Sequence, residues 1–157
     1  MGTKTALYDQ DFYAWTQEQA AFLREGAVHE LDLVHLAEEI ESLGKSDRRA
    51  LGSHLRNLVL HLLKWHYQPS GRLTGHSWQS SIRNARAEIA VLLEDSHGLQ
   101  HDVAGLLARW YPLARLDAAD EKGLPLATFP PTCPWEPAHV LAADFWPDDD
   151  SAAPFRP

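Results

Sequence analysis

Residues 51–65, with the sequence LGSHLRNLVLHLLKW, decide the fold class. Their apolar side chains recur every three or four residues, at Leu51, Leu55, Leu58, Leu62 and Trp65. This spacing lines one face of an α-helix, whereas a half-buried β-strand would alternate apolar and polar residues. We therefore predict a helix here, with Leu58 and Leu62 deep in the core.

The same apolar phase extends toward the N-terminus, where the carboxylate of Asp32 can cap the start of a helix. Gly44 and Ser46 interrupt the pattern, so one long helix over residues 33–67 and two shorter helices both fit. Pro69 restricts the residue before it and ends the segment. The apolar residues of the first part are Leu33, Leu36, Ala37, Ile40 and Leu43.

Three further helices are expected. The first covers about residues 10–25, capped by Asp9 and closed by Gly26 in a left-handed conformation. The second opens at Ser77 and ends near Asp95.

The last of these helices is capped by Ser96 and carries apolar residues as far as Ala114. Pro112 lies inside it and lacks a backbone N–H. We expect Pro112 to kink this helix or to end it early.

The C-terminal segment has a different character, because Leu124–Pro157 holds eight of the ten prolines. It predicts an extended tail with one short helix near residues 138–142. Its apolar residues Phe129, Trp135, Val140, Leu141, Phe145 and Trp146 favour packing on the helices. We expect an all-α bundle of four or five helices forming one domain over residues 1–146, with the tail 124–146 packed on it and residues 147–157 disordered.

The composition of the chain argues against several classes of protein, among them nucleic-acid-binding, membrane-spanning and disulfide-bonded proteins. A net charge of −8 argues against general binding to nucleic acid or to anionic membranes. The apolar runs are far shorter than the about 20 residues of a membrane span, and the N-terminus lacks the apolar core of a signal peptide. A lone cysteine, Cys133, has no partner for an internal disulfide. We expect a soluble, cytoplasmic protein without membrane contact.

The middle of the chain is basic, although the net charge of the whole chain is negative. Residues 45–86 contain eight Lys or Arg and one acid, a net +7 that leaves −15 for the remainder. Residues 64–86, around one turn, combine cationic and aromatic side chains. Such a set can bind a phosphate group or stack on a nucleic-acid base. The same set also fits a structural corner in which the arginines pair with acids. The residues of this anion-binding candidate are Lys64, Trp65, Gln68, Trp78, Arg83 and Arg86, with Tyr67 beside them.

Two weaker candidate sites remain. His35 lies one turn before Glu39, with Glu38 and Glu41 alongside, which is half of a carboxylate and histidine metal site. No second Glu-x-x-His completes a two-metal site, so these acids equally form a solvated face or pair with Arg83 and Arg86. His61 is the best single candidate for catalysis, although a structural histidine bonded to the backbone is the simpler interpretation.

Several motifs resemble a bacterial family of uncharacterised proteins, the domain of unknown function 29. The matching segments are LYDQDFYAW (7–15), LAEEIESLG (36–44), HLLKW (61–65) with Gln68 and Pro69, SW (77–78) with IR (82–83) and Arg86, LEDS (93–96) and TCP (132–134). The resemblance covers nearly the whole chain in order. It implies a compact helical protein and brings no accepted activity.

The sequence favours a non-enzymatic protein that works through contacts with itself or with a protein partner, without a cofactor. The reasons are the lack of glycine-rich phosphate loops and catalytic motifs, together with aromatic residues of the kind that interfaces favour. The alternative is an anion-binding, nucleic-acid-binding or phosphodiester-processing protein that uses residues 64–86. If the cations of this segment pair with acids within the monomer, the interaction-protein hypothesis is favoured. If they line an open cleft, the anion-binding hypothesis is favoured.

Overall fold

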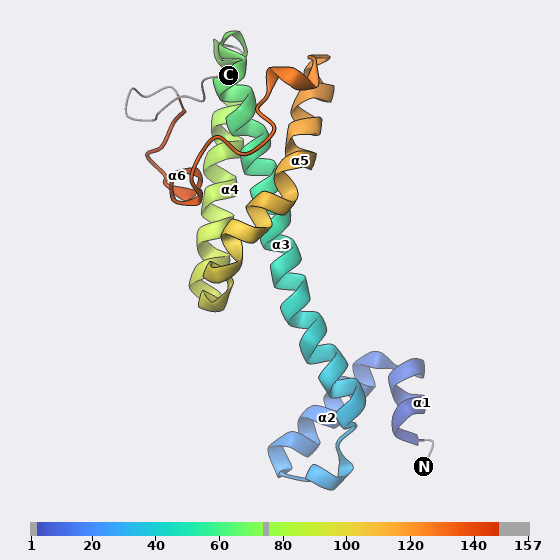
Figure 1. Ribbon diagram of the computed structural model, residues 1–157. Coiled ribbons are helices and arrows are strands. Elements are labelled where there is room, and N and C mark those ends of the chain that lie inside the picture. The colour runs from blue at the N-terminus through green and yellow to red at the C-terminus, as the bar shows by residue number, and fades with distance from the viewer. Residues whose placement is uncertain (1–2, 74–75, 148–157) are drawn as a thin grey trace. The chain divides into compact units, whose positions relative to one another are not determined.

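The computed structural model describes residues 3–73 and 76–147, and within these ranges it is helical without any strand (Figure 1). The prediction of an all-α fold is confirmed. The α-helices are α1 (Thr3–Gln10), α2 (Phe12–Glu25), α3 (Leu33–Tyr67), α4 (His76–Asp95), α5 (Val103–Lys122) and α6 (Pro137–Leu141). Short 3₁₀ turns lie between several of them.

The chain divides into two compact units, the N-terminal unit (Met1–Ser46) and the C-terminal unit (Asp47–Pro157). Helix α3 supplies residues to both, because it is one continuous helix and does not break at Gly44. The structure thus decides between the two arrangements that the sequence allowed for residues 33–67. One domain over residues 1–146 stays a prediction.

The first helices of the N-terminal unit differ from the expectation. The Asp11 carboxylate, and not Asp9, caps α2 by accepting a hydrogen bond from the Ala14 amide at 2.9 Å. Asp9 instead belongs to α1, which the sequence reading missed because eight residues are too short to show a clear helical period. Gly26 ends α2 with φ of 70°, as predicted.

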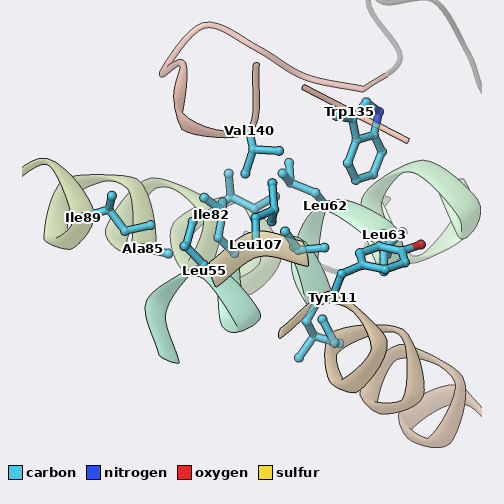
Figure 2. Packing of buried hydrophobic residues seen from close by; sticks show 14 of the residues in the cluster. Leu55, Leu62, Leu63, Ile82, Ala85, Ile89, Leu107, Tyr111, Trp135 and Val140 are labelled. Atoms are coloured by element: carbon cyan, nitrogen blue, oxygen red, sulfur yellow. The ribbon is translucent and has the colours of Figure 1, made fainter. Parts of the chain in front are cut away.

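The C-terminal unit holds the main apolar core, built from one face each of α3, α4 and α5 (Figure 2). Leu55, Leu58, Leu62 and Ile82 are fully buried there, which confirms the expected phase of α3. Helix α4 ends at Asp95 as expected. Ser96 then precedes a 3₁₀ turn, His97–Asp102, and its side chain makes no capping bond to the described residues, so the predicted cap is wrong.

Helix α5 does not end early at Pro112, but continues to Lys122. Its ribbon changes direction along its length (Figure 1). Tyr111, Ala114 and Ala118 are buried on the core on both sides of the proline, so packing holds the helix across the missing hydrogen bond. Gly123 closes the helix with φ of 61°.

The tail packs on this core through Phe129, Trp135, Val140 and Phe145, all of them buried. Its short helix, α6, lies close to the predicted range. The Tyr111 hydroxyl donates to the Pro130 carbonyl oxygen at 2.6 Å and fixes the start of the tail. Pro147 is buried, and the rest of the segment expected to be disordered, residues 148–157, lies outside the described residues.

Gly52 marks the close approach of α3 and α5. A Cβ atom built there would lie 2.3 Å from the indole nitrogen of Trp110. We expect Gly52→Ala to lower the free energy of unfolding by about 1–3 kcal/mol through overpacking, although alanine is the better helix former. Gly105→Ala is the control, because nothing lies within 4 Å of its added Cβ. Urea titration should show a loss for the first variant and none for the second.

Among the described residues, no helix combines the length and the apolar character needed to cross a bilayer.

Candidate functional site

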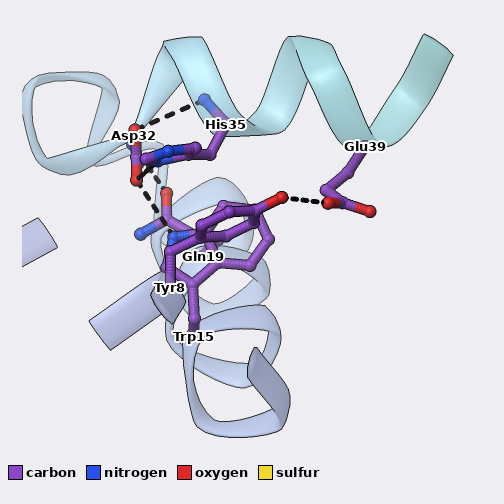
Figure 3. Close-up of polar contacts among 6 residues, drawn as sticks. All are labelled: Tyr8, Trp15, Gln19, Asp32, His35 and Glu39. Carbon is purple, nitrogen blue, oxygen red and sulfur yellow. Dashed lines mark hydrogen bonds and ion pairs between the residues drawn. The ribbon is translucent and has the colours of Figure 1, made fainter. Parts of the chain in front are cut away.

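A polar cluster joins the three helices of the N-terminal unit (Figure 3). Its centre is Asp32, which is 8% exposed and directly precedes α3. The Asp32 carboxylate accepts hydrogen bonds from Trp15 Nε1 at 3.1 Å and from His35 Nδ1 at 2.7 Å. The Asp32 amide donates to Gln19 Oε1 at 2.7 Å, so α2 and the start of α3 are linked on both sides.

Tyr8 closes the cluster from α1. Its ring stacks on the His35 imidazole with centroids 3.9 Å apart and planes 13° from parallel. Its hydroxyl donates to Glu39 Oε1, one turn further along α3 (Figure 3). His35 and Glu39 therefore do face the same way, as their spacing predicted, but in the described structure each is held by a protein group.

The hydrogen bonds of this cluster shift its pKa values. The hydrogen bond from the hydroxyl to Glu39 raises the pKa of Tyr8 to about 12. The hydrogen bond to Asp32 raises the pKa of His35 against the opposing effect of burial. Burial acts to raise the pKa of Asp32, but the bonds from His35 and Trp15 outweigh it and lower that pKa. Asp32 and His35 thus form an ion pair whenever the imidazole is protonated.

This linkage predicts how the stability of the N-terminal unit depends on pH. The raised pKa of His35 gives stability that is complete below about pH 6.5 and is lost as pH rises through the pKa of the folded state. The lowered pKa of Asp32 gives stability that is lost as pH falls through its folded value. The protection factors of the α2 amides, which are exchange rates corrected for the intrinsic effect of pH, should be largest between these two pKa values. His35→Gln should remove the loss on the alkaline side.

An imidazole held by a carboxylate at Nδ1 is an arrangement that general bases and metal-ligating histidines share. However, no group of three or more His, Cys, Asp or Glu side chains among the described residues is placed to hold a metal ion. What the geometry does is join three helices through hydrogen bonds where apolar burial is sparse. Trp15 is the one large apolar side chain buried among the described residues of this unit.

Many of the large apolar side chains of the N-terminal unit are exposed. Eight of them are between 48% and 72% exposed, whereas Leu7, Phe22, Leu31 and Leu36 are half-buried. Eight of the twelve exposed large apolar residues in the described structure belong to these 46 positions. They are Phe12, Tyr13, Leu23, Val28, Leu33, Val34, Ile40 and Leu43.

Arg48, Arg56 and Lys64 of the basic middle of the chain pair with acids within the C-terminal unit. Arg56 forms two hydrogen bonds with Asp117 of α5, at 2.7 and 2.9 Å. The ammonium of Lys64 is buried and lies 2.6 Å from a carboxylate oxygen of Glu121, also on α5. It also lies 5.1 Å from the centroid of the buried Trp78 ring. Lys64 and Trp78 therefore serve the packing of α3, α4 and α5.

Trp65 and Gln68 of the anion-binding candidate lie where α3 ends. Trp65 packs against Trp146 of the tail, with ring centroids 4.9 Å apart, and its carbonyl accepts from Arg72 Nε at 2.6 Å. Gln68 is half-buried at the end of α3, and its Nε2 makes no hydrogen bond to the described residues.

Within residues 3–73 and 76–147, neither Arg83 nor Arg86 forms an ion pair with a carboxylate of α3 or of the tail. Arg86 is buried, and its Nε donates to the Val140 carbonyl oxygen at 3.0 Å. Burial lowers the pKa of Arg86, which nearby Asp144 partly offsets. Arg83 is exposed and forms no ion pair with any residue that the structure describes. The described part of the tail thus meets Arg86 with a backbone carbonyl, and pairing with residues 148–150 stays a prediction.

These surroundings predict opposite effects for the two arginines. Arg83→Ala should change the free energy of unfolding by no more than about 0.5 kcal/mol, as for other exposed positions. Arg86→Ala leaves the buried Val140 oxygen without its donor, which should cost about 1–3 kcal/mol. Guanidinium chloride titration measures both. A large loss for Arg83→Ala would indicate a carboxylate partner in residues 148–157.

The histidine and cysteine candidates have structural surroundings. His61 Nδ1 donates to the Asn57 carbonyl oxygen at 2.8 Å, and burial lowers the pKa of its imidazole. Cys133 lines an apolar pocket of about 360 Å³ beside Tyr111 and Trp135. Burial raises the pKa of the Cys133 thiol, which works against a reactive thiolate. A catalytic role for His61 stays a prediction.

Sequence reasoning missed Tyr8 and Trp15 as members of the polar cluster. Asp32 was recognised only as a cap, although its spacing of three from His35 is a signal that both lie on one helical turn. The contacts of Tyr8 and Trp15 join residues 31 and 17 positions apart, which no local pattern reveals.

No curated protein and no solved structure matches the chain. The model of one family does match, over residues 7–146, and its description is domain of unknown function DUF29. This range includes the polar cluster, the apolar core and most of the described tail. The chain therefore belongs to the DUF29 family.

Proposed function

We propose that this protein is a non-enzymatic interaction protein whose N-terminal unit binds a protein surface. The observation that carries the proposal is that polar side chains of this unit are buried while many of its large apolar side chains are exposed. Asp32 and Gln19 are inside with Trp15, while eight large apolar side chains are outside. A polar interior of this kind fixes the geometry of the helices, and the exposed apolar residues supply the area that an interface buries.

The alternative, an anion-binding or nucleic-acid-binding protein, has less support from the geometry. Lys64 is paired with Glu121, and Arg86 is bonded to a backbone oxygen beneath the tail. Of the three cations in the candidate set, Arg83 alone is exposed within the described structure. Titration of the full chain with inorganic phosphate, followed by tryptophan fluorescence, should show no saturable change that Arg83→Ala abolishes.

The proposal is tested by photo-crosslinking in cells that produce the full chain. A photoreactive amino acid at Ile40 should give a covalent adduct with a protein chain, because this side chain is 67% exposed on the proposed surface. The control position is Val91 of α4, which is 55% exposed in the C-terminal unit. An adduct at position 40 that is much stronger than at 91 is the expected result. Equal labelling at both positions would contradict the proposal.

A further inference from the structure

A cavity of about 430 Å³ opens beside the second half of α4, within the C-terminal unit. Its lining includes Arg86, Ala90, Leu93 and Glu94, whose spacing places them along one side of α4. The 3₁₀ turn after α4 and the short helix α6, which lies beside α4 in Figure 1, complete the lining. The volume falls within the range of small-molecule sites, about 300–1,000 Å³.

The cavity has a buried inner wall and an exposed rim. Arg86 is 6% exposed and Leu93 is 7% exposed, so both belong to the inner wall. Ala90, Glu94 and His97 are exposed and form the rim. A cation therefore lies inside the cavity, and an acid lies at its entrance.

The buried cation lacks a partner for most of its hydrogen bonds. Arg86 Nε donates to the Val140 carbonyl oxygen at 3.0 Å. Its two terminal nitrogens are buried and make no hydrogen bond with residues 3–73 or 76–147. Asp144 lies near enough for its charge to act on Arg86, but the two form no ion pair. Because buried charged groups almost always have a partner, this guanidinium indicates an acceptor other than the described residues.

The orientation of the guanidinium and the composition of the walls indicate what kind of acceptor fits. With Nε occupied, the two terminal nitrogens offer a pair of parallel N–H groups, which match the two oxygens of a carboxylate. Ala90, Leu93 and Leu141 supply apolar walls for a short hydrocarbon body. The negative charge of Glu94 at the rim opposes a multiply charged anion such as phosphate more strongly than a monocarboxylate.

Binding requires a local movement of side chains. The terminal nitrogens of Arg86 are covered, and the centroid of the Trp146 ring lies 5.7 Å from Arg86 Cζ. Trp146 itself is half-buried. A carboxylate in the cavity therefore reaches the guanidinium when this group turns toward the cavity or when the Trp146 ring shifts. Both movements would change the environment of the Trp146 indole.

We propose that this cavity binds a small organic monocarboxylate, whose carboxylate pairs with Arg86 and whose apolar body contacts Ala90, Leu93 and Leu141. The site lies in the C-terminal unit, so it is independent of the interaction surface proposed for the N-terminal unit.

Titration of the full chain with sodium hexanoate, followed by two-dimensional NMR, tests the proposal. Saturable shifts are expected at Arg86 Nε–H, at the amides of Ala90 and Glu94, and at the Trp146 indole. Hexanamide, which has the same body without the charge, should bind at least about tenfold more weakly, as should inorganic phosphate. The absence of a saturable shift would overturn the site. Equal affinity for hexanamide or for phosphate would overturn the assignment of a monocarboxylate.

Variants of exposed residues test the site without disturbing the core. Ala90→Phe fills the cavity from its rim and should abolish hexanoate binding. Ala87→Phe is the matched control, because Ala87 is exposed on the same helix and is not part of the lining. Glu94→Gln removes a like charge and should tighten binding about two- to fivefold. Circular dichroism should show that all three variants keep their helices. Unchanged binding in Ala90→Phe, or equal loss in Ala87→Phe, would overturn the proposal.

A last variant separates an external ligand from the acids at the end of this chain. Asp148→Asn/Asp149→Asn/Asp150→Asn removes the acidic run that follows the described tail. Its affinity for hexanoate should equal that of the wild type. A gain of at least about tenfold would mean that these carboxylates compete for Arg86, and it would overturn the proposal of a site for an external ligand.

Discussion

Leu58→Ala is expected to lower the free energy of unfolding by about 2–5 kcal/mol. Leu58 is fully buried among side chains of α3, α4 and α5, so the truncation loses the transfer free energy of the side chain and leaves a cavity. The effect is large because the surrounding helices are long and relax only partly. Urea titration followed by circular dichroism measures it.

Val91→Ala provides the control for this prediction. Val91 lies on α4 and is 55% exposed, so its truncation should change stability by no more than about 0.5 kcal/mol. If Leu58→Ala lost less than about 1 kcal/mol, the assigned face of α3 would be wrong. If the two variants lost similar free energies of unfolding, the difference in burial between Leu58 and Val91 would be contradicted.

Asp32→Ala is expected to destabilise the N-terminal unit selectively. The substitution removes the acceptor of Trp15 Nε1, and this indole is 1% exposed, so a buried donor is left without a partner. Such a group costs about 1–3 kcal/mol. His35 loses its orienting bond in the same step. Amide exchange should accelerate in α2 and at the start of α3, and stay unchanged around Ile82 and Ile89 in α4.

The matched control is Asp9→Ala. Asp9 is an exposed acid of the same unit, and within the described structure its side chain makes no hydrogen bond. We expect its amide exchange to resemble that of the wild type. Equal acceleration in both variants would mean that net charge, and not the Asp32 hydrogen bonds, sets the stability of this unit.

The fold was predictable wherever an apolar stripe was long and well packed. The helical spacing of Leu51, Leu55, Leu58 and Leu62 predicted the main core correctly. Helices α4 and α5, each 20 residues long, bury this face of α3. The stop at Pro69 and the left-handed Gly26 were predictable because each depends on local backbone sterics. Of the two effects expected of Pro112, a kink or an early end, the early end is wrong, because packing on both sides of the proline holds α5 across the missing hydrogen bond.

The candidate site was only partly predictable. His35 and Glu39 were singled out by their spacing, and the structure does place both in one cluster. Their partners Asp32 and Tyr8 were not identified, since a cap residue and a tyrosine in an unrecognised helix carry no distinctive local signal. Arg86 shows the converse case. Charge patterning favoured a carboxylate partner, but the partner is a backbone oxygen, which every residue has.

The most direct test of the central claim is radical footprinting of side chains in the full chain, both in the cells that produce it and after purification at high dilution. Ile40 and Leu43 are exposed, so they should be labelled in the dilute purified chain and protected in cells, where a protein surface covers them. Leu58 should stay unlabelled throughout, because it is buried within the C-terminal unit. Equal labelling of Ile40 and Leu43 in the two samples would contradict the claim that the N-terminal unit binds a protein surface.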